Sequence, residues 1–172
     1  GVGISTSSIQ SSMNRPFAVV IFLLHCCVFT QSLVLGRGGS KQEDFLVKSL
    51  PGLFENVPKD DIPTVFSGQL ELFSENSTYY YFQKYVDPHK VEAAKGKTIF
   101  WLNGGPGCLS MDGALMEAGP FRINSEGKVV YNNGSWHKAG DVVFVDQPAG
   151  TGFSYSNLYD HNLVAVAHHF LR

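Results

Sequence analysis

The sequence predicts an α/β fold whose mixed sheet opens with an antiparallel hairpin and continues with strands that alternate with helices. Three observations support this prediction. Two strand-like segments flank a polar turn, an apolar run stops at a glycine-rich loop, and a second apolar run enters another glycine-rich turn. The chain has 172 residues, enough for one modest domain.

The predicted hairpin spans residues 64–85. Residues 64–73 alternate roughly between apolar and polar side chains, as in a half-buried strand. Residues 74–77 are polar and break the pattern, and residues 78–85 are rich in aromatic side chains that favour strands. Such aromatic density also fits a ligand platform, but hairpin packing explains it more simply.

Further strands are predicted in the second half of the chain. They cover residues 98–102, 121–123, 129–131 and 141–146. The last is the clearest candidate for a central strand, because four consecutive apolar residues stand between two carboxylates.

Two helices are predicted between or after these strands. One covers residues 110–116, with Ser110 as a candidate N-cap and with Leu115 and Met116 facing the core. The other covers residues 163–172, where apolar residues recur at helical spacing.

Residues 1–36 are typical of a secretory signal rather than of a folded domain. Arg15 precedes an apolar run over residues 17–29, and small residues follow it. The run is shorter than the about 20 residues that span a bilayer, and a buried helix is the alternative. Because Met13 stands just before Arg15, we expect the residues before Met13 to be an upstream extension. This leaves residues 37–172 as the domain.

Composition and cysteine usage limit the class of protein. The formal net charge of −2 gives no basic footprint, so no nucleic-acid partner is expected. Removal of the signal would take Cys26 and Cys27 with it and leave Cys108 alone in an oxidising compartment. Cys108 is then either a buried free thiol or one half of a disulfide. Because the helical pattern still runs at Arg172, we expect its partner further along a longer chain.

The glycine-rich loop after residue 102 is the strongest candidate site. Glycines at 104, 105 and 107 let the loop turn tightly and aim peptide N–H groups at developing negative charge. The α/β-hydrolases build part of an oxyanion hole from such a loop after their third strand. A nucleotide-phosphate cradle is disfavoured, since neither the Lys-Ser/Thr pair nor the Gly-x-Gly-x-x-Gly spacing is present. A purely structural turn remains as the alternative.

Other polar residues give weaker signals. The histidines form no metal-binding pattern: His168 and His169 are adjacent in a helix, and the rest of those outside the signal (His89, His137, His161) lie in polar, loop-like contexts. Asp146 follows a strand, but no Ser–His partners are evident, so its expected role is to hold the next turn. The chain contains no Gly-x-Ser-x-Gly elbow.

Two N-glycosylation patterns are present, Asn76-Ser77-Thr78 and Asn133-Gly134-Ser135. Both fall at predicted turns, where a glycan would not disturb a core. The predicted secretory signal strengthens this expectation.

Three blocks closely resemble the serine carboxypeptidases. They are residues 101–108 (Trp-Leu-Asn-Gly-Gly-Pro-Gly-Cys), 113–121 (Gly-Ala-Leu-Met-Glu-Ala-Gly-Pro-Phe) and 144–155 (Phe-Val-Asp-Gln-Pro-Ala-Gly-Thr-Gly-Phe-Ser-Tyr). The resemblance spans roughly residues 44–172 and implies the amino-terminal part of an α/β-hydrolase fold. Residues 50–52 (Leu-Pro-Gly) and 110–113 (Ser-Met-Asp-Gly) are similar to the fungal carboxypeptidase D, or pheromone-processing, type. The resemblance places the catalytic Ser, Asp and His beyond Arg172, so the chain alone is expected to be inactive.

The resemblance also implies roles for residues of this chain. The Gly105 N–H would stabilise the oxyanion of the tetrahedral intermediate. Asn103 and the Gly104 backbone, with Trp101 as a wall, would hold the terminal carboxylate of the peptide, and Glu117 would join that network.

Two further implications concern the end of the loop. Cys108 would form a disulfide with a later cysteine. Leu109 departs from the family pattern, in which two serines usually follow the cysteine, and stands at the first of these positions.

The implied function is the release of carboxy-terminal residues, Lys or Arg in this type, from peptides or proteins without a cofactor. The expected location is the secretory pathway: late Golgi, vacuolar or extracellular, with a membrane attachment only through an anchor beyond Arg172. Two alternatives stay open. One is a non-catalytic α/β-hydrolase relative, and the other is a secreted glycoprotein fragment whose glycine turn is only architectural.

Overall fold

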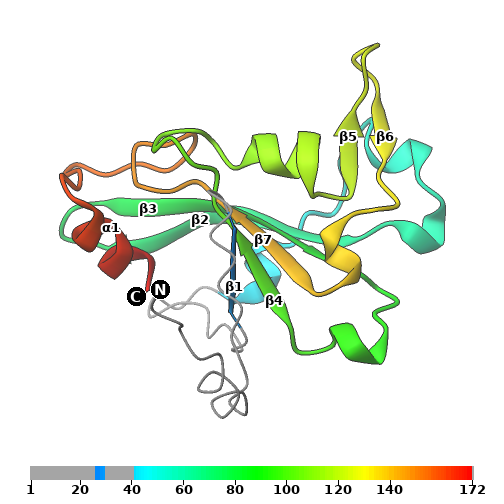
Figure 1. Ribbon diagram of the computed structural model, residues 1–172, viewed down its shortest axis with the longest axis horizontal. Coiled ribbons are helices and arrows are strands. Elements are labelled where there is room, and N and C mark those ends of the chain that lie inside the picture. Colours follow the sequence, from blue (N-terminus) through cyan, green and yellow to red (C-terminus); the bar gives the residue numbers. More distant parts are fainter. Residues whose placement is uncertain (1–25, 30–40, 172) are drawn as a thin grey trace, which may run out of the picture.

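A mixed five-stranded sheet forms the centre of the computed structural model, which describes residues 26–29 and 41–171 (Figure 1). The strand order is β1-β4-β7-β3-β2. The strands are β1 (Cys26–Phe29), β2 (Thr64–Phe73), β3 (Thr78–Val86), β4 (Thr98–Trp101) and β7 (Asp141–Val145). β4 and β7 are parallel, whereas the other neighbours are antiparallel. The predicted mixed sheet with an antiparallel hairpin is therefore confirmed.

The hairpin pairs β2 with β3 from Thr64 opposite Val86 to Phe73 opposite Thr78. The polar residues 74–77 form the turn, as predicted. Along β3 most buried side chains alternate with half-buried ones, which is the pattern of a strand with one face on the core.

β1 pairs antiparallel with β4 at one edge of the sheet. Its four residues belong to the segment for which the sequence predicts a secretory signal. The rest of that segment lies outside the described residues, so the signal, its cleavage and the domain boundary at residue 37 stay predictions.

β7 is buried on both faces, as expected for a central strand. Val142 and Phe144 face one hydrophobic cluster, together with Trp101 and Phe121, which lies next to the helical segment after residue 110. Val143 and Val145 face a second cluster against which Phe170 packs. Figure 1 shows the corresponding layers, with the helical segment and β5–β6 on one side of the sheet and α1 on the other.

The predicted helix at 110–116 is a short π-helix over Gly113–Glu117. The Ala118 N–H donates to the Gly113 carbonyl at 2.8 Å, the i+5 bond of that geometry. Two details of the prediction are wrong. Ser110 does not cap the helix, because its hydroxyl bonds elsewhere, and Met116 is 57% exposed while Ala114 is fully buried.

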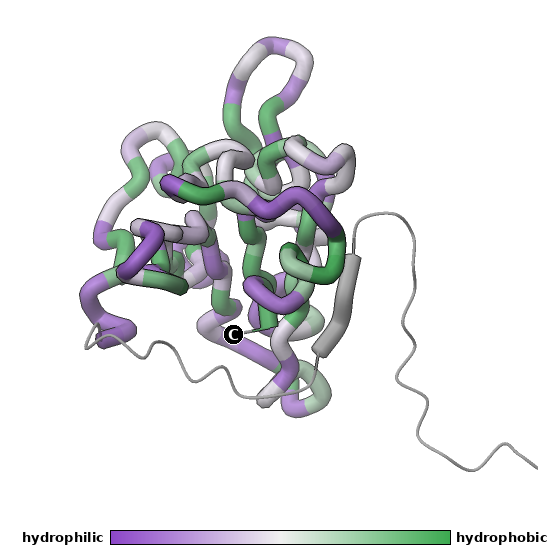
Figure 2. Tube along the Cα trace, turned by 90° about the vertical axis from the view of Figure 1, so that its left-hand side faces the viewer, coloured by the Kyte–Doolittle hydropathy of each residue, from purple (hydrophilic) through white to green (hydrophobic). Residues whose placement is uncertain are grey.

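Short elements complete the fold. β5 (Phe121–Ile123) and β6 (Val129–Tyr131) form a second sheet, as predicted. Its projecting tip is hydrophilic (Figure 2). Single 3₁₀ turns occupy Gln42–Phe45, Phe54–Asn56, Lys59–Asp61, Glu92–Ala94 and Trp136–Lys138.

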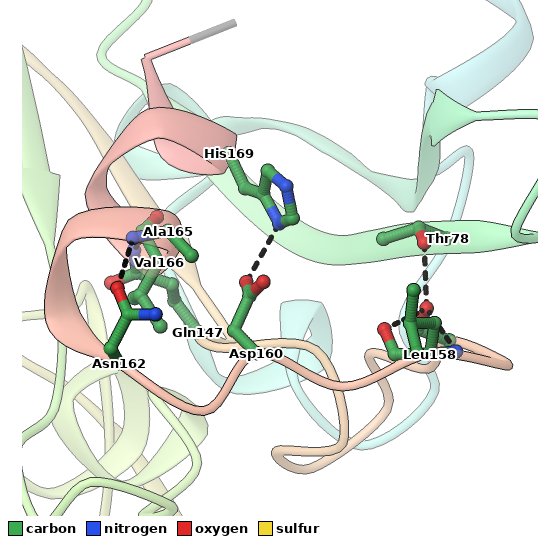
Figure 3. A network of polar contacts seen from close by, with 9 residues as sticks. Thr78, Gln147, Leu158, Asp160, Asn162, Ala165, Val166 and His169 are labelled. Carbon is green, nitrogen blue, oxygen red and sulfur yellow. Dashed lines mark hydrogen bonds and ion pairs between the residues drawn. The ribbon is translucent and has the colours of Figure 1, made fainter.

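The last element is α1 (Leu163–Phe170), where the sequence predicts it. The Asn162 side chain caps it by accepting from the Ala165 N–H at 2.9 Å. Figure 3 shows how polar contacts attach this helix to the preceding chain: Gln147 donates to the Val166 carbonyl, and His169 contacts Asp160 at 2.7 Å. Among the described residues, no helix has the length and apolarity needed to cross a membrane.

Candidate active-site loop

The glycine-rich loop begins where β4 ends and is fixed there by two side chains. The indole Nε1 of Trp101 donates to the Asn103 side-chain oxygen at 2.5 Å. Because the oxygen accepts this bond, the amide orientation is set and the NH₂ group of Asn103 points away from the indole. Trp101 itself is only 7% exposed.

Trp101 is held by close packing on several sides. The bare Cα of Gly113 lies against the indole, so that an added Cβ would stand 2.1 Å from Nε1. The rings of Trp136 and Phe144 contact Trp101 with centroids 5.4 and 6.1 Å away. The indole is therefore a rigid support for Asn103.

The loop itself needs glycine at two positions. Gly105 and Gly107 have φ of +127° and +106°, a region that side chains rarely adopt. A Cβ on Gly105 would also lie 3.1 Å from the Gly107 nitrogen and 3.3 Å from the Cys108 nitrogen. The Cys108 N–H closes the loop by donating to the Gly104 carbonyl at 3.2 Å.

The amides at the tip of the loop are free to bind something else. Neither the Gly104 N–H nor the Gly105 N–H donates to an acceptor in the part of the chain that the structure describes. Gly105 is exposed and Gly104 half-buried. Together with the Asn103 NH₂ group, the loop presents neutral N–H donors and no carboxylate.

Glu117 is the predicted site residue that the structure does not join to the loop. It lies at the end of the π-helix, exposed, and its backbone carbonyl accepts from Arg122 at 2.5 Å. No hydrogen bond or ion pair connects its carboxyl group to another described residue. Its part in a carboxylate-binding network stays a prediction.

Asp146 holds the second glycine-rich turn, as predicted. Its Oδ2 accepts from the Phe153 N–H at 3.0 Å, and its backbone carbonyl accepts from the Ser154 hydroxyl at 2.6 Å. It also reaches the first loop, since its Oδ1 accepts from the Ser110 N–H at 2.7 Å. Sequence reasoning missed this link, because Ser110 reads as an ordinary helix cap.

A hydrogen-bonded Ser–His pair occurs in the fold but is not a nucleophile and its base. Ser135 Oγ lies 2.8 Å from His137 Nδ1, yet the hydroxyl donates its proton to the Ala118 carbonyl at 2.9 Å. His137 Nδ1 must therefore be the donor in the pair. Both side chains are buried, which corrects the loop-like setting expected for His137. Burial lowers the pKa of His137.

The other predicted sites lie at the surface. Cys108 is exposed with a free thiol. Asn76 and Asn133 both lie in turns, the former half-buried and the latter exposed. Within the described ranges, no group of His, Cys, Asp and Glu residues is arranged to hold a metal ion.

Comparison with known proteins gives a consistent picture. Residues 58–172 match the family model of the serine carboxypeptidases. The chain is 65% identical to pheromone-processing carboxypeptidase KEX1 of Meyerozyma guilliermondii over 78% of its own length and 21% of that protein. It is also 65% identical to the protein of the same name from Debaryomyces hansenii, over 75% of this chain and 19% of that one. The chain thus spans about a fifth of the length of these relatives.

A solved structure extends the likeness to the fold. The crystal structure of Kex1(delta)p, a prohormone-processing carboxypeptidase from Saccharomyces cerevisiae, superposes with a TM-score of 0.68 at 40% identity. The match covers 77% of this chain and 31% of that chain. The sheet described above is accordingly the amino-terminal part of an α/β-hydrolase fold, and the chain belongs to the serine carboxypeptidase family.

Proposed function

We propose that the complete protein is a serine carboxypeptidase that releases carboxy-terminal residues from peptides, and that residues 101–105 recognise the peptide's end. The observation that carries this proposal is the Trp101–Asn103 hydrogen bond beside the unpaired amides of Gly104 and Gly105. An exopeptidase must distinguish a terminal carboxylate from an internal peptide bond. Neutral N–H donors that no protein acceptor occupies can bind that carboxylate.

The two halves of the loop would serve different steps. The Asn103 NH₂ group and the Gly104 N–H would donate to the terminal carboxylate, and Trp101 would form a wall beside it. The Gly105 N–H would donate to the oxyanion that forms when a serine hydroxyl, supplied by the rest of the family's domain, attacks the scissile carbonyl. Glu117 would complete the carboxylate site as the neutral acid, because only a protonated carboxyl group can donate a hydrogen bond.

The test is Asn103→Ala in the complete gene product. KM for a peptide with a free carboxylate should rise about tenfold or more, the effect of losing a hydrogen bond to a charged group. KM for the same peptide with an amide or ester cap should change little. Asn103→Asp is a sharper variant, because it keeps an oxygen for Trp101 but turns a negative charge toward the substrate. Equal losses on both substrates would contradict the proposed role.

We further propose that the protein works in the secretory pathway, in the late Golgi, the vacuole or outside the cell, on peptide and protein carboxyl termini that include Lys and Arg. The two sequons at Asn76 and Asn133 support this location, as does the signal-like segment.

Asn76→Gln and Asn133→Gln should each remove one glycan, visible as a gel shift that endoglycosidase treatment abolishes. Cys108 should form a disulfide in the complete protein, which non-reducing peptide mapping would detect. An unshifted Asn133→Gln variant would argue against glycosylation there.

A further inference from the structure

We propose that Ser110 and Asp146 are positioning residues that lock the substrate-binding loop to the second glycine-rich turn. This inference rests on the proposed function of the loop at 101–105. Neither side chain bonds to the N–H of Gly104 or Gly105, and both are fully buried. They act on substrate only through the backbone that they hold.

Ser110 links Asn103 to the end of the central strand β7. Its hydroxyl donates to the Val145 carbonyl at 2.6 Å and accepts from the Asn103 N–H at 3.1 Å. A hydroxyl has one proton, so the donation to Val145 leaves its lone pairs for Asn103. Without the Ser110 hydroxyl, the Asn103 N–H would lose its hydrogen-bond partner. Asn103 directly precedes Gly104 and Gly105, so the backbone that carries their amides would lose this anchor.

Asp146 supplies the second half of the link. Its two carboxylate oxygens serve two different segments: Oδ1 accepts from the Ser110 N–H at 2.7 Å, and Oδ2 accepts from the Phe153 N–H at 3.0 Å. An asparagine of the same shape could satisfy only one of these N–H groups, because its NH₂ would face the other. The site therefore specifies a carboxylate.

The second turn approaches this carboxylate through a bare backbone. An added Cβ on Gly152, where φ is +52°, would stand 2.2 Å from Asp146 Oδ2 and 3.0 Å from the Cβ of Leu109. Gly152 thus packs on Leu109, the residue that follows Cys108 in the first loop. A continuous path of contacts runs from Phe153 through Asp146 and Ser110 to Asn103.

A positioning role makes a prediction that a general contribution to stability does not. If the link orients the loop, its loss should loosen residues 102–109 and raise KM for free-acid peptides more than KM for capped ones. Ser156 provides a matched control. It is 5% exposed and its hydroxyl contacts the Thr78 hydroxyl at 2.6 Å and the Leu158 N–H at 3.0 Å, but it has no bond to the loop.

The experiment compares Ser110→Ala, Asp146→Asn and Ser156→Ala in the complete gene product. Hydrogen exchange of the segment 102–109 should become faster in the first two variants and stay unchanged in the third. KM for the free-acid peptide relative to its ester should rise about fivefold in Ser110→Ala, the effect of one lost hydrogen bond. Ser156→Ala should lower Tm without moving this ratio. Adding Ser110→Ala to Asn103→Ala should raise the ratio little further.

The outcomes separate this inference from the proposed function. Unchanged exchange over 102–109 in Ser110→Ala would overturn the positioning role, whatever the kinetics. A second outcome is faster exchange in Ser110→Ala together with an unchanged KM ratio in Asn103→Ala. It would keep the positioning role of Ser110 and Asp146 but would contradict carboxylate recognition by Asn103, and with it the proposed function of the loop. Should Ser110→Ala fail to fold, Ser110→Cys places a somewhat larger thiol at the hydroxyl position and weakens both hydrogen bonds, and the same measurements apply to it.

Discussion

Gly113 and Trp101 are in direct contact, so that the bare Cα of the glycine occupies the space in which any side chain would collide with the indole nitrogen. This contact joins the π-helix to the residue that orients Asn103. It therefore affects both stability and the binding loop.

Gly113→Ala should destabilise the protein, although a glycine-to-alanine change within a helix usually stabilises it. The added Cβ would lie 2.1 Å from Trp101 Nε1, and overpacking of this kind costs about 1–3 kcal/mol. Urea unfolding measures the change. Gly134→Ala is the control, since its Cβ would meet only Asn132 at 3.5 Å. A Gly113→Ala variant as stable as the wild type would show that the contact is looser than described.

Trp101→Phe should weaken binding of peptides with a free carboxylate while preserving most of the packing. It removes the Nε1–H that fixes the Asn103 amide, a bond with a net value of about 1 kcal/mol, or about fivefold in KM. The measurement is KM for a free-acid peptide against its ester. Trp136→Phe retains an aromatic contact with Trp101 and should leave this ratio unchanged. If both variants shift the ratio equally, aromatic packing and not the hydrogen bond orients Asn103.

Gly105→Ala and Gly107→Ala form a pair that separates backbone strain from catalysis. Both positions have positive φ, but only Gly105 carries the proposed oxyanion donor, and only its Cβ would press on the Cys108 amide. Both variants should therefore lose stability, by about 1–3 kcal/mol. Turnover should fall by about tenfold or more in Gly105→Ala alone. Steady-state kcat with thermal unfolding tests this, and equal kcat losses would place the donor elsewhere.

His137 should make the protein less stable in acid. Burial lowers the pKa of His137 below its ordinary 6.5, so the unfolded chain binds this proton more readily than the folded one. The stability associated with the neutral ring is fully present above pH 6.5 and is lost as the pH falls toward the lowered pKa. His137→Gln should flatten the decline of unfolding free energy below pH 6.5. If the unfolding free energy of His137→Gln falls as steeply below pH 6.5 as that of the wild type, His137 is not the cause of the decline.

Local patterns predicted most of the sheet. The alternation over residues 64–73, the aromatic run after residue 77 and the apolar run at 142–145 are signals that lie within one strand each. They gave the hairpin and the central strand because a strand's burial follows directly from its own side chains.

The failures share a physical cause, which is dependence on contacts distant in sequence. Ser110 resembles an N-cap, but its hydroxyl is taken by the carbonyl of Val145, 35 residues away. The burial of His137 depends on a short turn packed beside the end of the π-helix, with Ser135 bonded to Ala118. The turn after the π-helix needs glycine at position 119, where a Cβ would lie 1.9 Å from the Ala114 carbonyl oxygen. No periodicity in the sequence carries such information.

The shared space between Leu109 and Gly152 has an evolutionary and engineering consequence. A side chain at position 152 would meet the Asp146 carboxylate at 2.2 Å as well as the Leu109 Cβ at 3.0 Å, so position 152 should stay glycine when relatives diverge, whatever residue stands at position 109. Grafting residues 101–109 onto another scaffold would for the same reason require residues 146–153 to travel with them.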